Sequence, residues 1–142
     1  MAYGFQVTVD SVAPHELADW WADALGWQVE PSDEAFISRM VAEGHATEDQ
    51  TMTHNGVLVW TEGQAIRHPD EPAYPRVLFV KVPEQKSLKN RLHLDVRVGK
   101  ERIEAELERL SAKGATFLHR GSQGPNWWVT LADPQGNELC LS

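Results

Sequence analysis

The segment from Lys89 to Val98 alternates between apolar and polar residues with a period of two. In a strand, Leu92, Leu94, Val96 and Val98 would share one face, and His93, Asp95 and Arg97 would share the other. A second alternating segment, from Phe5 to Asp10, lies near the start of the chain. Both segments are therefore predicted to be strands with one buried face.

Helical spacing follows each of these strands. Pro14 begins an apolar stripe that includes Leu17, Trp20 and Trp21, and Gly26 is placed to end that helix. After the second strand, Ile103, Leu107 and Leu110 repeat in the same way, and Gly114 ends the helix. Gln6 and Gly26 are 20 positions apart, and His93 and Gly114 are 21 apart. The chain is thus predicted to contain two copies of a strand, a helix and three strands, with Gln6 and His93 at equivalent positions.

The other elements follow from turn residues and shorter apolar runs. In the first half we expect an extra helix capped by Ser32 or Asp33, a loop over residues 47–53, and strands over residues 56–60 and 76–82. In the second half we expect strands over residues 115–118, 127–131 and 137–141, a loop over 121–124, and a turn over 133–136. Glu84, Lys86, Lys89 and Arg91 are interpreted as a connector held by exposed ion pairs.

Composition limits the class of protein. The 142 residues suffice for one domain, with module one at about residues 1–84, a connector at 83–89 and module two at about 90–142. The formal charge of −8 argues against nucleic acid or an acidic membrane as partner. The single Cys140, the lack of a signal-like N-terminus and the lack of about 18 uninterrupted apolar residues predict a cytoplasmic protein without a membrane span.

Several stretches together resemble the vicinal oxygen chelate superfamily, which includes glyoxalase, bleomycin-resistance and dioxygenase proteins, and most closely its actinobacterial glyoxalase-like subgroup. The resemblance covers nearly the whole chain. It lies in residues 14–21, Leu25-Gly26-Trp27, Val82-Pro83-Glu84 with Lys86, residues 89–95, and residues 127–129 with 133–138.

This resemblance implies an α+β fold of two tandem βαβββ modules that form a cup-shaped, open mixed barrel, and commonly a homodimer. The metal ligands of the family come from the first strand of each module and the last strand of the second. Here these positions are Gln6, His93 and Glu138. The resemblance implies a divalent metal, with Zn, Mn, Fe, Ni and Mg not distinguished, and Glu138 in a catalytic role.

The residue types agree with such a site. An imidazole, a carboxylate and an amide oxygen suit a divalent ion that keeps open positions for a substrate. Thr8 and Asp95, two residues beyond Gln6 and His93, would orient the ligands or contact substrate. Trp60, Phe79 and Trp128 are candidates for the wall of the cavity, because the six Trp need a core, a pocket or an interface. The alternative is that His93, Asp95 and Thr8 are polar residues facing water.

Two functions from different classes remain open. One is a metal-dependent lyase, isomerase or dioxygenase acting on a small oxygenated organic molecule. The other is a metal-free protein that binds or sequesters a small molecule, as resistance proteins of this superfamily do. Residues 77–80 offer no carboxylate where glyoxalase I-like members have one, which favours the second function. A third class, a structural role with protein partners, would be indicated by a cavity filled with side chains.

Overall fold

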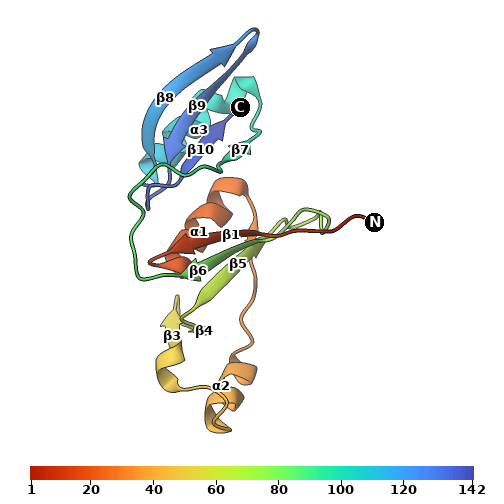
Figure 1. Ribbon diagram of the computed structural model, residues 1–142, viewed down its shortest axis with the longest axis vertical. Coiled ribbons are helices and arrows are strands. Elements are labelled where there is room, and N and C mark those ends of the chain that lie inside the picture. Colours follow the sequence, from red (N-terminus) through yellow and green to blue (C-terminus); the bar gives the residue numbers. More distant parts are fainter. The chain divides into compact units, whose positions relative to one another are not determined.

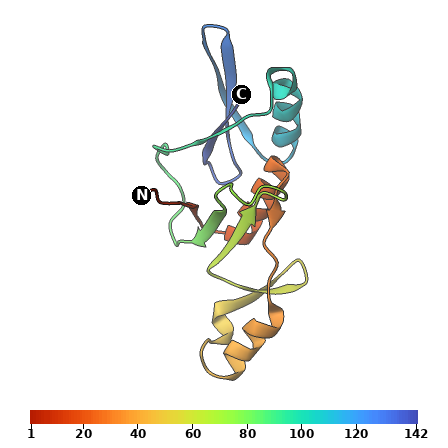
Figure 2. The same ribbon diagram turned by 90° about the vertical axis from the view of Figure 1, so that its right-hand side faces the viewer.

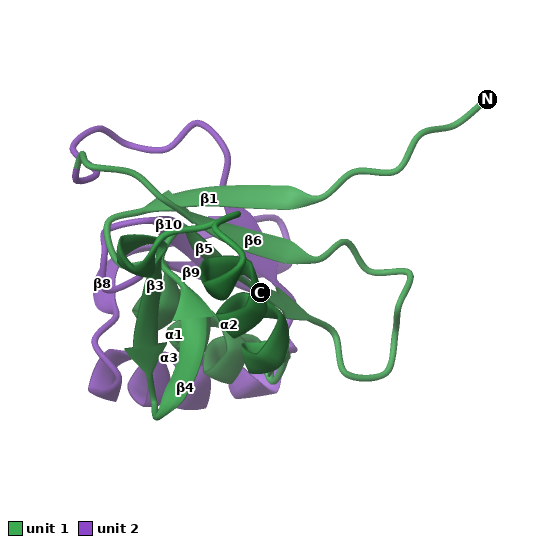
Figure 3. Ribbon diagram, turned by 90° about the horizontal axis from the view of Figure 1, so that it is seen from below, with its two compact units in different colours: residues 1–84 green, residues 85–142 purple.

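A computed structural model describes all residues, 1–142, and divides the chain into two compact units, residues 1–84 and 85–142 (Figure 3). The strands form two separate four-stranded sheets and one two-stranded hairpin rather than a single closed barrel. None of the helices is both long and apolar enough to cross a membrane.

Unit 1 has a sheet in the order β1-β6-β5-β2, with β1 and β6 parallel and the other neighbours antiparallel (Figure 1). Helix α1 packs against this sheet, chiefly against β5 and β6. The elements of the sheet and its helix are β1 (Val7–Ser11), α1 (Pro14–Leu25), β2 (Gln28–Val29), β5 (Gly63–Arg67) and β6 (Val77–Lys81).

Unit 2 repeats this architecture. Its sheet has the order β7-β10-β9-β8, so in both units the first strand pairs in parallel with the last. Its elements are β7 (Leu94–Val96), η2 (Lys100–Arg102), α3 (Ile103–Ala112), β8 (Thr116–Gln123), β9 (Asn126–Ala132) and β10 (Glu138–Leu141). The predicted duplication and the predicted α+β class with two βαβββ modules are confirmed.

An insertion between β2 and β5 distinguishes unit 1 from unit 2. It contains α2 (Glu34–Ala42), the short helix η1 (Glu48–Gln50), and a hairpin of β3 (Thr51–His54) and β4 (Val57–Trp60). Figures 1 and 2 show the hairpin and α2 together at one end of unit 1. Asp33 caps α2, as predicted, because its Oδ1 accepts a hydrogen bond from the amide of Phe36 at 3.0 Å.

The core of each unit lies between its helix and one face of its sheet. In unit 1, Leu17 and Trp21 of α1 pack in the same buried layer as Phe79 of β6. Pro14 begins α1 and Gly26 ends it at a φ of 67°, as the sequence predicted. In unit 2 the corresponding buried residues are Ile103, Leu110, Val129, Leu131, Leu139 and Leu141.

The strand predicted from Lys89 to Val98 is much shorter in the structure. Only Leu94–Val96 is a strand, and the Leu92 side chain is 89% exposed. The predicted alternation of side chains is correct for Leu94 and Val96, which are half-buried. Strand β7 lies at the edge of its sheet and has only β10 as a neighbour. The periodicity could not show where that pairing ends.

Three further predictions were wrong in detail. Where a loop was predicted over residues 47–53, the structure has η1 (Glu48–Gln50) and the start of β3 (Thr51–His54). Strand β3 is polar and pairs only with β4, so its sequence lacks the apolar alternation that predicts a strand. Residues 121–123 extend β8 up to a tight turn at Gly124. Strand β5 was missed, because Gly63 and the two polar residues of Gly63–Arg67 hide a segment whose Ala65 and Ile66 are buried.

Candidate functional site

The polar face of the unit 2 sheet brings the predicted second-module residues together. Leu94 and Leu139 are paired in the parallel ladder of β7 and β10. His93 and Glu138, one residue earlier on each chain segment, are therefore neighbours on the face opposite the leucines. Asp95 is paired with Cys140 two residues further along and shares that face.

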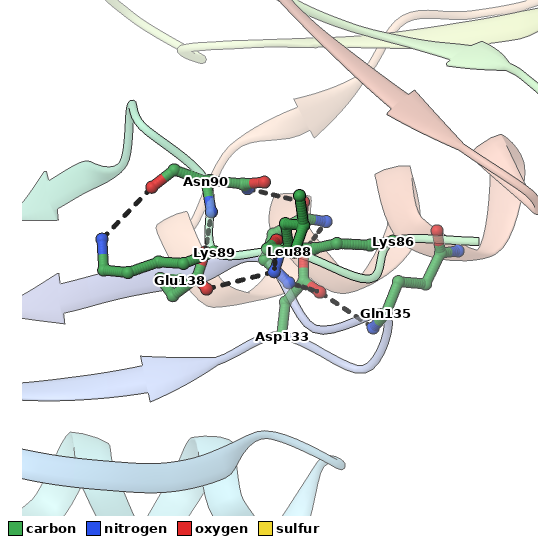
Figure 4. Close-up of polar contacts among 8 residues, drawn as sticks. Lys86, Leu88, Lys89, Asn90, Asp133, Gln135 and Glu138 are labelled. Atoms are coloured by element: carbon green, nitrogen blue, oxygen red, sulfur yellow. Dashed lines mark hydrogen bonds and ion pairs between the residues drawn. The ribbon is translucent and has the colours of Figure 1, made fainter. Parts of the chain in front are cut away.

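Glu138 is held through both of its carboxylate oxygens (Figure 4). Its Oε1 accepts a hydrogen bond from the ammonium of Lys86 at 3.1 Å, and its Oε2 accepts one from the backbone amide of Asn90 at 3.1 Å. The side chains of Lys86 and Glu138 are only 18% and 10% exposed. Burial alone would raise the pKa of Glu138, but the hydrogen bonds from Lys86 and from backbone amides outweigh it and hold that pKa below its ordinary value.

The turn before β10 supports this arrangement. The buried Asp133 accepts hydrogen bonds from the amides of Gln135 at 2.8 Å and Asn137 at 3.0 Å, and from the Asn137 side chain at 2.9 Å. Asn137 in turn accepts a hydrogen bond from the side chain of Asn90 at 2.9 Å. The turn predicted over residues 133–136 therefore also positions the residue whose amide binds Glu138.

His93 forms a pair with Asp95. Its Nδ1 lies 3.3 Å from Asp95 Oδ1, and both side chains are exposed. The carboxylate lies beside Nδ1 at ion-pair distance, which leaves Nε2 available as a ligand. The ligand atoms of His93, Asp95 and Cys140 all lie within 4.8 Å of one another. Burial is the main cause that raises the pKa of the Cys140 thiol.

Gln6 in unit 1 and His93 in unit 2 occupy equivalent positions relative to the first strand of each unit. Gln6 directly precedes β1, and His93 directly precedes β7, which agrees with the predicted equivalence. Gln6 Nε2 donates a long hydrogen bond of 3.4 Å to Thr8 Oγ1, and both residues are exposed. The joint role of Gln6, His93 and Glu138 stays a prediction, because they belong to separate units.

The three aromatic candidates differ in where they lie. Trp128 is paired with Gly121 and shares the polar face with Glu138 and Cys140, as its register requires. A Cβ added at Gly121 would lie 2.4 Å from the Trp128 ring, so the indole lies directly over the Gly121 backbone. Trp60 is half-buried at a small pocket beside α2. Phe79 is fully buried, so its ring belongs to the core of unit 1 rather than to the wall of an open cavity.

The sequence interpretation missed Lys86 and Asn90 as parts of the site. Lys86 was assigned to an exposed connector, but in the structure its ammonium also donates to the carbonyl of Leu88 at 2.8 Å and is mostly buried. The signal that could have found it is chemical. The carboxylate of Glu138, at the start of the buried strand β10, needs a compensating cation. Lys86 is one of few basic residues in the connector between the two modules.

These features agree with the matches to known proteins. A family model described as a glyoxalase-like domain matches residues 6–142. The chain belongs to this family. It is therefore a member of the vicinal oxygen chelate superfamily, as predicted, while the actinobacterial subgroup stays a prediction. No curated protein sequence matches the chain.

Several solved structures share this glyoxalase-like fold at low sequence identity. The fosfomycin resistance protein FosX from Mesorhizobium loti has a TM-score of 0.65 at 9% identity, over 99% of this chain and 91% of that one. A mutant FosX from Listeria monocytogenes, in complex with Mn(II) and dihydroxypropylphosphonic acid, has a TM-score of 0.66 at 10% identity, over 99% and 92%. The bleomycin-binding protein from Streptomyces verticillus, in complex with copper(II)-bleomycin, has a TM-score of 0.54 at 13% identity, over 100% and 96%.

The donor types at the predicted site fit a divalent metal ion. His93 offers an imidazole nitrogen, Glu138 offers an ionised carboxylate, and Gln6 offers an exposed amide. Glu138 would have to exchange one partner, because the ammonium of Lys86 binds the same carboxylate that the metal would use. A metal ion at this site would therefore compete with Lys86 for the carboxylate of Glu138.

Proposed function

We propose that this protein binds a small oxygenated organic molecule on the polar faces of its sheets, beside a divalent metal ion held by Gln6, His93 and Glu138. The observation that carries the proposal is the pair of His93 and Asp95. In metal sites a carboxylate commonly accepts the second N–H of a ligating histidine and keeps its other nitrogen directed at the metal. FosX, which shares the fold, binds Mn(II).

In this proposal the metal would supply a Lewis acid that polarises the oxygens of the substrate. The residues of the chain do the rest. Asp95 orients His93, and Asn90 and Lys86 hold the Glu138 carboxylate in its ionised form. These contacts keep Glu138 ionised at neutral pH, the form in which a carboxylate accepts a proton, and its lowered pKa makes it a weak base. Thr8 and Trp128 would contact the bound molecule from the sheet faces.

A second candidate function is metal-free binding or sequestration of a small molecule. The ion pair between Lys86 and Glu138 favours it, because the ammonium already supplies the positive charge that the carboxylate needs. In this case Trp128 would hold a flat ligand by stacking, and no chemical step would follow. The bleomycin-binding protein, which shares the fold, is bound to copper(II)-bleomycin.

We also propose that the protein works as a homodimer. The connector leaves Leu88 at 81% exposed, the segment before β7 leaves Leu92 at 89% exposed, and the N-terminal arm leaves Phe5 at 76% exposed. A second copy of the chain would remove these apolar side chains from water. Sedimentation equilibrium measures the state directly, and a monomer at micromolar concentration would contradict the proposal.

Metal analysis distinguishes the two candidate functions. The protein is purified without chelator, incubated with Mn(II) or Zn(II) and dialysed, alongside His93→Ala and the control variant His45→Ala. His45 is an exposed residue beyond α2. The metal-dependent function requires stoichiometric metal in the wild type and in His45→Ala, and its loss in His93→Ala. If none of the three proteins retains metal, the metal-dependent function is wrong and the metal-free one stands.

A further inference from the structure

A cleft of about 710 Å³ lies within unit 1, at the end of the sheet where β1 and β6 begin and β5 ends. Gln6, Arg67 and Arg76 border it from the sheet, and the loop between β5 and β6 forms its other side. Phe5 and Tyr74 contribute exposed rings. Its size is in the range of sites that take a drug-sized molecule.

One wall of the cleft is a packed group of aromatic rings. The rings of His68 and Tyr74 are stacked, with centroids 5.0 Å apart and planes at 13°. The Trp27 ring meets both of them edge-on, at 5.6 Å from His68 and 6.1 Å from Tyr74. Tyr74 is 58% exposed and lines the cleft, and its ring is supported by those of His68 and Trp27. A supported, exposed ring is a surface for stacking a flat ligand.

The loop that carries this wall is held in place by His68. The Nδ1 of His68 accepts hydrogen bonds from the amides of Asp70 at 3.1 Å and Glu71 at 3.0 Å. The amide of Tyr74 donates to the carbonyl of Glu71 at 3.1 Å, and Pro69, Pro72 and Pro75 restrict the backbone further. The aromatic wall is therefore formed before any ligand binds, which lowers the entropic cost of binding.

Of the two arginine guanidinium groups in the cleft, that of Arg67 is available to bind a ligand. Arg76 forms an ion pair with Glu30 at 3.2 Å, across the sheet. Arg67 is exposed and forms no ion pair in the structure. Its strand position is paired with Gln28, so both side chains lie on the face of the sheet that borders the cleft. Glu71, on the loop between β5 and β6, also lines the cleft. A planar guanidinium with free donors is suited to bind a carboxylate through two hydrogen bonds.

We propose that this cleft binds a planar aromatic carboxylate, with its ring against Tyr74 and its carboxylate at Arg67. The inference names a substrate class and rests on the proposed function in one respect: Gln6, one of the proposed metal ligands, borders the same cleft. Binding of the ring and of the carboxylate needs no metal. It can therefore be measured separately.

Isothermal titration in excess chelator tests the proposal, with naphthoate and its neutral alcohol analogue naphthylmethanol as probes. Wild type is expected to bind naphthoate at least about tenfold more tightly than the alcohol, because a charge-assisted bidentate contact is lost with the carboxylate. Arg67→Gln is expected to weaken naphthoate binding about tenfold and to leave the alcohol unchanged. Tyr74→Leu is expected to weaken both. Arg39→Gln, on α2 and outside the cleft, is the matched control and should bind like the wild type.

Equal naphthoate affinity in wild type and Arg67→Gln, or no binding of either probe to wild type at millimolar concentration, overturns the proposal. Both Arg67 and Tyr74 are exposed, so their variants should fold, and circular dichroism checks this. The chelator separates this test from the metal test. Loss of naphthoate binding would leave the metal content of wild type and His93→Ala unaffected, and loss of metal would leave naphthoate binding unaffected.

Discussion

The ammonium of Lys86 lies 3.1 Å from Oε1 of Glu138, in a pair that is mostly withdrawn from water. Two consequences follow. The carboxylate is kept ionised, and any metal ion that uses it must displace the ammonium or share the carboxylate with it. Lys86 therefore keeps the carboxylate ionised and would compete with any cation that binds to it.

Replacing Lys86 by Met is expected to have opposite effects on stability and on metal binding. It leaves Glu138 with the amide of Asn90 but no cation, which should cost about 1–3 kcal/mol of unfolding free energy. It also removes the competitor, so Mn(II) should bind more tightly than to wild type. Urea unfolding measures the first effect, and titration with Mn(II) followed by electron paramagnetic resonance measures the second.

Lys89→Met is the control for this substitution. Lys89 is exposed, and its ammonium donates only to the carbonyl of its neighbour Asn90 at 3.2 Å. The variant removes the same charge from the same connector without touching Glu138, so its unfolding free energy should match wild type and its Mn(II) affinity should rise less than in Lys86→Met. If Lys86→Met binds Mn(II) no more tightly than Lys89→Met, the ammonium of Lys86 and the Mn(II) ion do not compete for Glu138.

The sequence predicted what local periodicity and duplication determine. Spacing in the sequence predicted the two helices α1 and α3 and the strand after each of them. It also predicted the equivalent positions of Gln6 and His93, each at the start of the first strand of its module. It did not predict pairings set by contacts between distant segments. The burial of Lys86 depends on a carboxylate 52 residues further along the chain. The position of Trp128 over Gly121 depends on the register of β8 and β9, which a bulge between Phe117 and His119 shifts.

Substituting Gly121 by Ala should displace the ring of Trp128. The added Cβ would lie 2.4 Å from the indole, so the ring or the strand has to move. We expect a loss of about 1–3 kcal/mol in unfolding free energy, as for other overpacked sites, together with a shift in tryptophan fluorescence. If Trp128 contacts the bound molecule, ligand affinity falls as well.

Gly4→Ala serves as the comparison for Gly121→Ala. A Cβ at Gly4 would meet no atom within 4 Å. The same change of residue type should therefore leave both the fluorescence and the stability near the wild-type values. An unchanged emission spectrum in Gly121→Ala would mean that the indole does not lie over this position in solution.

Acid should weaken α3 through Glu106. Burial alone would raise the pKa of Glu106, but hydrogen bonds and ion pairs with Arg109 and Arg102 outweigh it and lower that pKa. Its Oε2 accepts from Arg109 Nε at 2.8 Å, and its Oε1 from Arg102 Nη2 at 3.1 Å. A group with a lowered folded-state pKa stabilises the fold fully above the ordinary glutamate pKa of about 4.3. That stability is lost as the pH falls through the lower folded pKa.

Unfolding free energies of wild type and Glu106→Gln, measured by urea at neutral pH and at several lower values, test this dependence. Wild type should be more stable by about 0.5–1 kcal/mol at neutral pH, and the difference should vanish in acid. Glu108→Gln, which removes a carboxylate from an exposed position on the same helix, is the control variant. A difference that grows on acidification would reverse the sign and contradict the assignment.

Asp133 should support the geometry around Glu138 through Asn137 and Asn90. Asp133→Ala leaves the amides of Gln135 and Asn137 without their acceptor at a buried position, which should cost about 2–4 kcal/mol. Asp133→Asn keeps one carbonyl oxygen for these amides and should lose less. Because Asn137 links Asp133 to Asn90, the amide resonance of Asn90 in a nitrogen–proton correlation spectrum should shift in Asp133→Ala. A large loss of stability with an unshifted Asn90 resonance would show that the turn supports the fold but not the carboxylate of Glu138.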